Sequence, residues 1–102
     1  MNNNYKLNYI LGNRYLDGNN NIGMHSDDER DLHGPIVSIS LGSERFFDFK
    51  SKVGKVKHRI NLKNGSMLVM DGNTQQHWKH GVPIQKKIKT TRINLTLRCI
   101  KT

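Results

Sequence analysis

Polar and apolar side chains alternate from Arg92 to Cys99, and this pattern constrains the fold more than any other feature of the chain. Successive side chains of a β-strand point to opposite faces, so residues 92–100 are predicted to form a strand with two unlike faces. The polar face carries Arg92, Asn94, Thr96 and Arg98. The apolar face carries Ile93, Leu95, Leu97 and Cys99. If the polar face is enclosed, its two guanidiniums must meet an anion or a carboxylate, because burying them unpaired is too costly. The alternative is an exposed polar face on an amphipathic edge strand.

Short apolar runs separated by turn residues make up most of the remaining sequence. These runs occupy residues 5–16, 36–41, 46–49, 56–62 and 67–70. The Asp-Gly-Asn-Asn-Asn stretch at 17–21 and the Lys-Asn-Gly triplet at 63–65 are typical of turns. Only residues 26–32 are predicted as a possible short helix, with a loop as the alternative. Several short strands with turns between them predict an all-β fold, a sandwich or a roll closed on itself.

The size and composition of the chain limit what kind of protein it is. With 102 residues there is room for one small domain, 1–102, and no second. No run approaches the roughly 18 apolar residues of a membrane-spanning helix, and no secretory signal follows Met1, so no membrane partner is expected. The single cysteine, Cys99, excludes an internal disulfide framework and a multi-cysteine zinc site. It suits a reducing compartment, so an intracellular protein, nuclear or cytoplasmic, is expected.

The chain is strongly basic, with 17 Lys and Arg against 8 Asp and Glu and a formal charge of +9. A field of this sign favours polyanions, nucleic acid first and anionic lipid a distant second. The alternative is a solvated surface that only keeps the protein soluble. The basic residues gather at 50–59 and 79–89, whereas acidic residues gather at 27–31. This acidic cluster suggests a metal or proton-handling site that faces an anionic partner.

Two histidines and one aspartate form a candidate metal site. His25 and Asp27 are two residues apart, so in an extended segment both side chains lie on one side and can bind one ion. His80 is the best candidate for the third ligand, and together these residues make the facial triad that leaves three positions open on a ferrous ion. A 2-oxo acid and dioxygen would fill those positions, and an arginine of 92–98 would bind the distal carboxylate of the acid. The expected reaction is oxidative hydroxylation of a nearby C–H bond. The remaining histidines are interpreted as surface or packed residues: His33, His58 and His77.

Seven segments together resemble the core of the AlkB-type Fe(II)/2-oxoglutarate dioxygenases. They are NRY at 13–15, IGMHSDDE at 22–29, PIVSISLG at 35–42, RFFDF at 45–49, GSMLVM at 65–70, HWKH at 77–80 and RINLTLR at 92–98. They follow the family's order over residues 5–100, and they look most similar to the branch that repairs alkylated DNA bases in nuclei. The Arg-x-Asn-x-x-x-Arg spacing of the last segment is highly specific for this family when it follows a His-x-Asp motif and a later histidine, here His25, Asp27 and His80.

The resemblance implies a role for individual residues. It implies iron binding by His25, Asp27 and His80. It implies 2-oxoglutarate contacts from Asn13, Tyr15, Arg92, Asn94 and Arg98. Glu29 matches a position that faces the exocyclic amino group of a damaged base, and Arg45 matches an arginine at the substrate mouth. The implied fold is the double-stranded β-helix, a jelly roll. The implied reaction is oxidative demethylation of 1-methyladenine or 3-methylcytosine in DNA or RNA, single-stranded or with the base flipped out, with release of formaldehyde.

The resemblance leaves the substrate open. Family members usually carry a long N-terminal extension that folds as a lid over the flipped base, whereas this sequence begins just upstream of Asn13. The chain is expected to be a segment of a longer protein, a minimal enzyme with a looser pocket, or a core that needs a partner. Two other functions are alternatives: hydroxylation of a protein or lipid substrate, and non-catalytic binding of nucleic acid.

Overall fold

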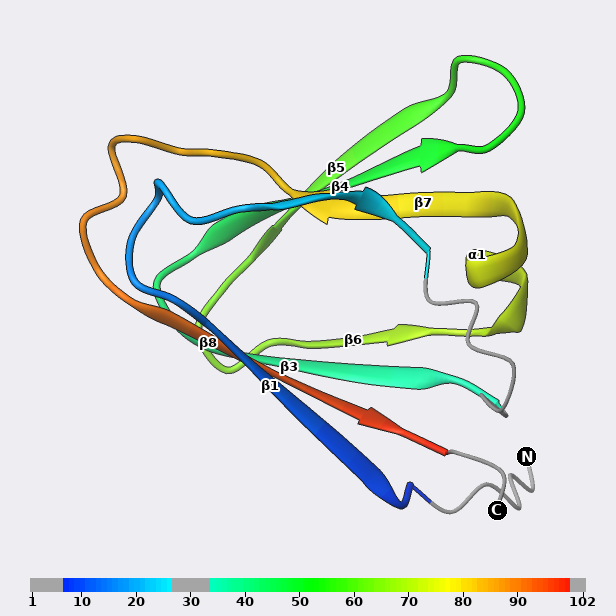
Figure 1. Cartoon of the computed structure of the whole chain (residues 1–102), viewed down its shortest axis with the longest axis horizontal. Helices are drawn as coiled ribbons and strands as arrows, with labels where there is room; N and C mark the ends of the chain where they lie inside the picture. Colours follow the sequence, from blue (N-terminus) through cyan, green and yellow to red (C-terminus); the bar gives the residue numbers. More distant parts are fainter. Residues whose placement is uncertain (1–6, 27–33, 100–102) are drawn as a thin grey trace.

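The computed structural model describes residues 7–26 and 34–99, and within them the chain forms eight strands and one short helix (Figure 1). The elements of the first half are β1 (Tyr9–Tyr15), β2 (Ile22–His25), β3 (Ile36–Gly42) and β4 (Arg45–Ser51). Those of the second half are β5 (Lys57–Leu62), β6 (Met67–Met70), α1 (Gly72–His77), β7 (Trp78–Val82) and β8 (Arg92–Arg98).

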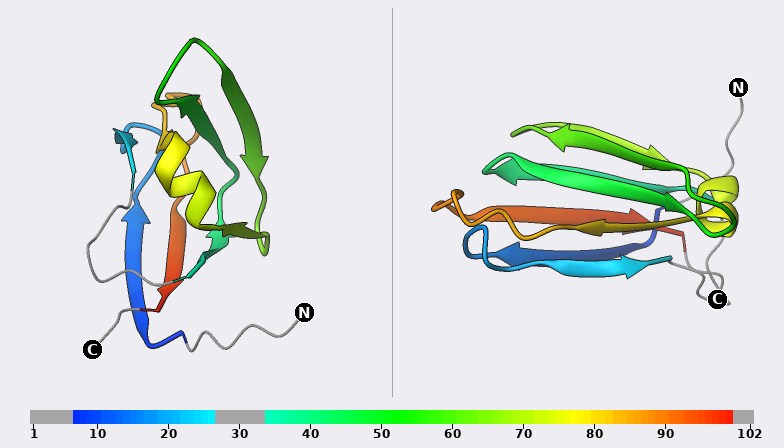
Figure 2. Two further views of the ribbon diagram at one scale, coloured as in Figure 1. Left: turned by 90° about the vertical axis from the view of Figure 1, so that its right-hand side faces the viewer. Right: turned by 90° about the horizontal axis from the view of Figure 1, so that it is seen from above.

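The strands build two antiparallel four-stranded sheets that face each other. One sheet has the order β1-β8-β3-β6 and the other the order β2-β7-β4-β5. The helix α1 links β6 of the first sheet to β7 of the second, at the end of the molecule that the left view of Figure 2 shows. The predicted all-β fold is confirmed, and the arrangement agrees with the jelly roll of the double-stranded β-helix.

Most of the predicted elements are confirmed, and three are additional. The five apolar runs and the C-terminal segment form β1, β3, β4, β5, β6 and β8, and Gly65 makes the predicted turn with a φ of 80°. The strands β2 and β7 were not predicted, because histidine, lysine and glycine break their apolar alternation. The helix α1 was also missed, although Asp71 caps it by accepting a hydrogen bond from the Thr74 backbone amide at 3.0 Å. The possible helix at 26–32 falls almost entirely outside the described residues.

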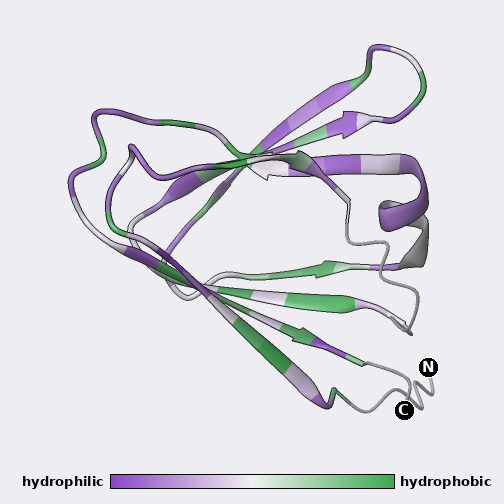
Figure 3. Cartoon of the chain, in the orientation of Figure 1, coloured by the Kyte–Doolittle hydropathy of each residue, from purple (hydrophilic) through white to green (hydrophobic). Residues whose placement is uncertain are grey.

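The strand β8 turns its polar face toward the interior. Arg92 is 1% exposed and Arg98 is 5% exposed, whereas Ile93 on the opposite face is 41% exposed. Figure 3 shows the hydrophobic residues concentrated on the β1-β8-β3-β6 sheet and the hydrophilic ones on β5 and β7. The enclosed-face interpretation of the Arg-x-Asn-x-x-x-Arg pattern is therefore confirmed, and the exposed edge strand is wrong, since β8 lies between β1 and β3.

A small apolar cluster between the sheets holds them together. Its buried members are Tyr15, Ile36, Phe47, Leu62, Met70 and Val82. One end of the molecule also depends on a close backbone approach, because a Cβ at Gly42 would lie 2.4 Å from the Thr91 carbonyl oxygen. Within the described residues, no helix is long and apolar enough to cross a membrane.

Candidate metal and cosubstrate site

His25 and His80 lie directly opposite each other on neighbouring strands. His25 ends β2, and its Cα partner in the antiparallel pairing with β7 is His80. The centroids of the two imidazole rings are 4.5 Å apart, with an angle of 61° between the ring planes. Close approach of the strands is built in at the next residue, since a Cβ on Gly81 would lie 2.8 Å from the Ile22 carbonyl oxygen. The sequence prediction that brought His25 and His80 together is supported by this geometry.

One hydrogen bond orients the ring of His25. Its Nδ1 lies 2.8 Å from the Gly23 carbonyl oxygen, and because a carbonyl can only accept, Nδ1 must donate the hydrogen. A histidine that binds a metal ion through one ring nitrogen commonly donates a hydrogen bond from the other nitrogen in this way. His80 is held differently, by stacking on Phe47 with the ring centroids 5.3 Å apart and the planes 22° from parallel.

The third predicted metal ligand cannot be placed beside the two histidines. Asp27 and the predicted substrate residue Glu29 both lie outside the described residues. Across residues 7–26 and 34–99, no three side chains of histidine, cysteine, aspartate or glutamate gather into one group. The structure therefore brings the two predicted imidazole ligands together, and the ligand roles of His25, Asp27 and His80 stay predictions.

A cavity of about 150 Å³ opens beside the two histidines, between the sheets. This volume corresponds to about five water molecules of the liquid, which suits a small metabolite. The cavity brings together six of the residues predicted to hold iron or 2-oxoglutarate: Asn13, Tyr15, His25, His80, Asn94 and Arg98. Among the residues that the structure describes, no acidic side chain lines it. Its wall, with a buried arginine and several hydrogen-bonding side chains, therefore favours an anionic ligand.

Arg92 lies behind this cavity against the ring of Tyr15. Its guanidinium carbon is 5.2 Å from the Tyr15 ring centroid, and its Nη2 donates to the Ser40 hydroxyl at 2.9 Å. Its Nε and Nη1 are buried and have no hydrogen-bond partner among the described residues. Burial lowers the pKa of Arg92, and the neighbouring Tyr15 only partly opposes that change. A buried cation with two free donors is costly unless an anion binds there.

Two serines of β3, to which the sequence analysis gave no role, position the polar side chains of β8. Ser40 receives the Arg92 hydrogen bond, and Ser38 accepts one from Asn94 Nδ2 at 2.6 Å. Both serines are buried, and they alternate along β3 with residues that face outward. Their spacing matches that of Arg92 and Asn94, because β3 pairs with β8 directly. This alternation of serine with valine and isoleucine was the signal that could have identified them.

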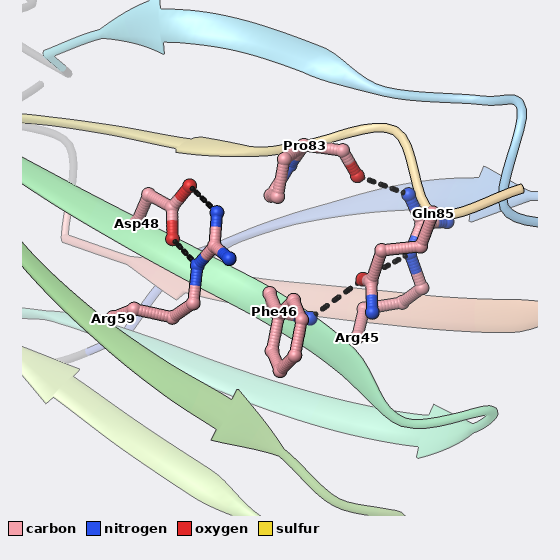
Figure 4. Close-up of polar contacts among 6 residues, drawn as sticks. All are labelled: Arg45, Phe46, Asp48, Arg59, Pro83 and Gln85. Carbon is pink, nitrogen blue, oxygen red and sulfur yellow. Dashed lines mark hydrogen bonds and ion pairs between the residues drawn. The ribbon is translucent and has the colours of Figure 1, made fainter.

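Arg45 is placed differently from its predicted position at a substrate mouth. It is 1% exposed, and its guanidinium donates to the carbonyl oxygens of Asp17, Asn20 and Pro83 and to Gln85 Oε1, with distances of 2.7–3.1 Å. Figure 4 shows the contacts with Pro83 and Gln85. Its guanidinium carbon is also 5.5 Å from the Tyr15 ring centroid. Arg45 thus ties two loops together behind Tyr15, and its donors are occupied by the chain itself.

The described residues fit the two groups that the predicted chemistry requires. Two imidazoles in register can hold a ferrous ion, and the unused donors of Arg92 match the bidentate geometry of a carboxylate. Burial raises the pKa of the Tyr15 phenol, although the charge of Arg92 opposes this, so the hydroxyl stays protonated at neutral pH and can donate to an anion. A two-histidine centre beside a buried arginine, inside a double-stranded β-helix, defines the class of 2-oxoglutarate-dependent iron oxygenases.

Comparisons with known proteins agree with this class. Residues 1–98 match the family described as the 2OG-Fe(II) oxygenase superfamily. The chain is 44% identical to the DNA oxidative demethylase ALKBH2 of Bos taurus, over 92% of this chain and 37% of that protein. It is 35% identical to the alpha-ketoglutarate-dependent dioxygenase alkB homolog 3 of Mus musculus, over 97% of this chain and 38% of that protein. The solved structure of OsALKBH1 superposes with a TM-score of 0.70 at 29% identity, over 87% of this chain and 48% of that chain.

The chain belongs to the AlkB family of 2OG-Fe(II) oxygenases. The family implies Fe(II) and 2-oxoglutarate as the groups that the site uses. The chain spans less than half of the length of the curated relatives that it matches.

Proposed function

We propose that this protein oxidatively demethylates N-alkylated bases, such as 1-methyladenine and 3-methylcytosine, in DNA or RNA. The observation that carries the proposal is the pairing of His25 and His80 beside a cavity backed by Arg92, whose Nε and Nη1 have no hydrogen-bond partner among the described residues. The names of its relatives, a DNA oxidative demethylase and an alpha-ketoglutarate-dependent dioxygenase, support the same reaction.

In this proposal His25, Asp27 and His80 hold the iron. When bound, ferrous iron would let dioxygen oxidise both 2-oxoglutarate, to succinate and carbon dioxide, and the N-methyl group, which leaves as formaldehyde. Phe47 keeps the His80 ring in one orientation by stacking on it. The hydrogen bond from His25 Nδ1 to the Gly23 carbonyl oxygen, at 2.8 Å, fixes the orientation of the His25 ring. Both contacts preorganise the ligands before the metal arrives.

Polar residues in the cavity wall, together with Arg92 behind it, bind the cosubstrate in this proposal. Arg92 receives the distal carboxylate of 2-oxoglutarate on Nε and Nη1, which matches its planar donor geometry. Tyr15 donates its phenolic hydrogen to the same end. The other predicted contacts come from three residues that line the cavity: Asn13, Asn94 and Arg98. Glu29 is proposed to face the exocyclic amino group of the base.

Basic residues on the outside of the second sheet support a nucleic-acid substrate. Lys50 of β4 pairs in register with Lys57 on one side and with Lys79 on the other, and all three are exposed. Like charges directly opposite each other destabilise a sheet, and phosphate groups would remove this repulsion. Two exposed lysines of the β4–β5 loop, Lys52 and Lys55, follow Lys50 along the chain, whereas the exposed Lys86, Lys87 and Lys89 lie in the β7–β8 loop at the other end of the strands (Figure 1). Binding is expected to weaken steeply as salt is added.

The proposal takes residues 1–102 as one core domain acting in a reducing, intracellular compartment, nuclear or cytoplasmic.

The proposal is tested by following formaldehyde release from methylated oligonucleotides. The protein is incubated with Fe(II), 2-oxoglutarate and a panel of 1-methyladenine and 3-methylcytosine strands, in DNA and RNA, single- and double-stranded. His25→Ala should abolish the release, because one of the two imidazoles is lost. His77→Ala is the matched control, since His77 is an exposed histidine at the end of α1. Release by His25→Ala at the wild-type rate would refute the metal assignment.

A further inference from the structure

Two buried arginines from different sheets meet the ring of one tyrosine. Arg45 of β4 and Arg92 of β8 are both almost fully buried, and so is Tyr15 of β1. The guanidinium carbon of Arg45 lies 5.5 Å from the Tyr15 ring centroid, and that of Arg92 lies 5.2 Å from it. Because both distances end at one centroid, the two guanidinium carbons cannot be further apart than these two distances together. The two positive charges therefore share one buried region.

The hydrogen bonds of the two guanidiniums do not neutralise their charges. Arg45 donates to three backbone carbonyl oxygens and to Gln85 Oε1, and Figure 4 shows two of these contacts. Arg92 donates to the Ser40 hydroxyl. Asp17 meets Arg45 through its backbone carbonyl oxygen. Within the described residues, all of these acceptors are neutral, so this region holds two like charges and would be stabilised by an anion.

The charge of Arg45 reaches the place where an anion would bind to Arg92. Burial lowers the pKa of Arg92, Tyr15 opposes this change, and the like charge of Arg45 lowers the pKa further. At an effective dielectric constant of about 20, two unit charges about 10 Å apart change a binding constant by roughly 10-fold. The same charge that repels Arg92 must attract an anion that binds beside it.

We propose that Arg45 is a positioning residue for the cosubstrate, whose charge strengthens binding of the distal carboxylate that Arg92 and Tyr15 receive. The inference rests on the proposed function, because it takes Arg92 and Tyr15 as the contacts of that carboxylate. Arg45 does not touch the acid, since its donors are occupied by the chain itself. The site would therefore favour a 2-oxo acid with a second carboxylate. If Arg45 only tied the two loops together, its loss would weaken every 2-oxo acid alike.

The test compares two acids of equal length that differ only at the far end. 2-Oxoglutarate carries a carboxylate there, and 2-oxopentanoate carries a methyl group. Binding to the full chain, loaded with Mn(II) in place of iron and kept free of dioxygen, is measured by isothermal titration calorimetry, so no turnover is needed. The ratio of the two dissociation constants reports the distal carboxylate alone. A change that only loosens the fold weakens both acids and leaves this ratio as it was.

Four variants separate the charge of Arg45 from its hydrogen bonds. Arg45→Gln, whose amide still donates, should raise the Kd of 2-oxoglutarate by about 10-fold and leave that of 2-oxopentanoate near its wild-type value. Arg45→Met, which has neither charge nor donors, should give the same ratio. Arg45→Lys should keep the wild-type ratio, because its ammonium keeps the charge and has three donors for the three carbonyl oxygens. Arg14→Gln is the matched control, since Arg14 precedes Tyr15 but is exposed, and water and salt screen its charge.

Each outcome separates this inference from the proposed function. An equal rise of both dissociation constants in Arg45→Gln, or the same change of the ratio in Arg45→Lys as in Arg45→Gln, would overturn the role of Arg45. Formaldehyde release by the wild type would then still support the demethylase. The expected ratios without formaldehyde release from any methylated strand would keep the role of Arg45 and refute the activity. If the wild type binds both acids equally, the carboxylate contact of Arg92 is refuted together with this inference.

Discussion

Replacing Arg45 with methionine tests the assignment of this arginine to a structural role. Methionine fills a similar space but donates no hydrogen bond. The change removes four hydrogen bonds from the guanidinium. Gln85 Oε1 retains a donor, the backbone amide of Phe46 at 2.8 Å. The carbonyl oxygens of Asp17, Asn20 and Pro83 lose their Arg45 contact.

The size of the effect follows from these contacts. A hydrogen bond from a charged donor contributes about 1.5–3 kcal/mol net, and a buried acceptor left without a donor costs about 1–3 kcal/mol. The losses do not add fully, because methionine also removes the cost of burying the charge of Arg45. We expect the free energy of unfolding to fall by about 3–5 kcal/mol. For a domain of this size the melting temperature should fall by about 12 °C or more.

Urea unfolding followed by circular dichroism measures the change, and Arg59→Met is the matched control. Arg59 forms two hydrogen bonds to the carboxylate of Asp48, at 2.7 and 2.9 Å, but its side chain is 54% exposed (Figure 4). Water and salt screen such a pair, so this variant should change stability much less, and less still in high salt. Equal losses for the two variants, or a loss below about 1 kcal/mol for Arg45→Met, would refute the argument from burial.

Three further outcomes follow from the site and the fold. Arg92→Met should raise the KM for 2-oxoglutarate by about 30-fold or more, because the ligand carboxylate loses its buried cation; an unchanged KM would contradict the assignment. N-Oxalylglycine at about 100 times its Kd should raise the free energy of unfolding of the wild type by about 2.7 kcal/mol in a thermal-shift assay, and the same concentration should do little for Arg92→Met. Gly42→Ala should destabilise the fold more than Gly54→Ala, because both glycines have a φ near 90° but only a Cβ at Gly42 meets backbone, at 2.4 Å; similar melting temperatures would argue against the close approach.

The sequence was sufficient to predict six of the eight described strands and the polar face of β8. Two-residue alternation determines which side chains share a face, but it does not determine which face turns inward. In the structure Ile93 faces outward and Arg92 inward, because β8 pairs with β3 and places Arg92 beside the buried hydroxyl of Ser40. That choice depends on a neighbouring strand more than fifty residues away in sequence.

The candidate site could be predicted only in part. His25 and His80 were paired from a motif, and the β2–β7 register supports that pairing. Arg45 was expected at the substrate mouth because it matches an arginine there in the family, whereas its partners are mostly backbone carbonyls of two loops. Backbone acceptors carry no residue-type signal, so no sequence pattern identifies them. The stacked ring of Phe47 was missed for a similar reason, since its role depends on the strand pairing.

The polar side chains between the two sheets lower the free energy of unfolding. The interior of the molecule carries Arg92, Asn94, Thr96 and Arg98 where a purely structural β-roll would carry valine or leucine, and within the described parts of the chain the apolar cluster has six buried members. Apolar replacements along β8 should therefore raise the free energy of unfolding and abolish the proposed binding of 2-oxoglutarate. Selection for stability and selection for the proposed catalytic activity thus favour different side chains at the seven residues of β8.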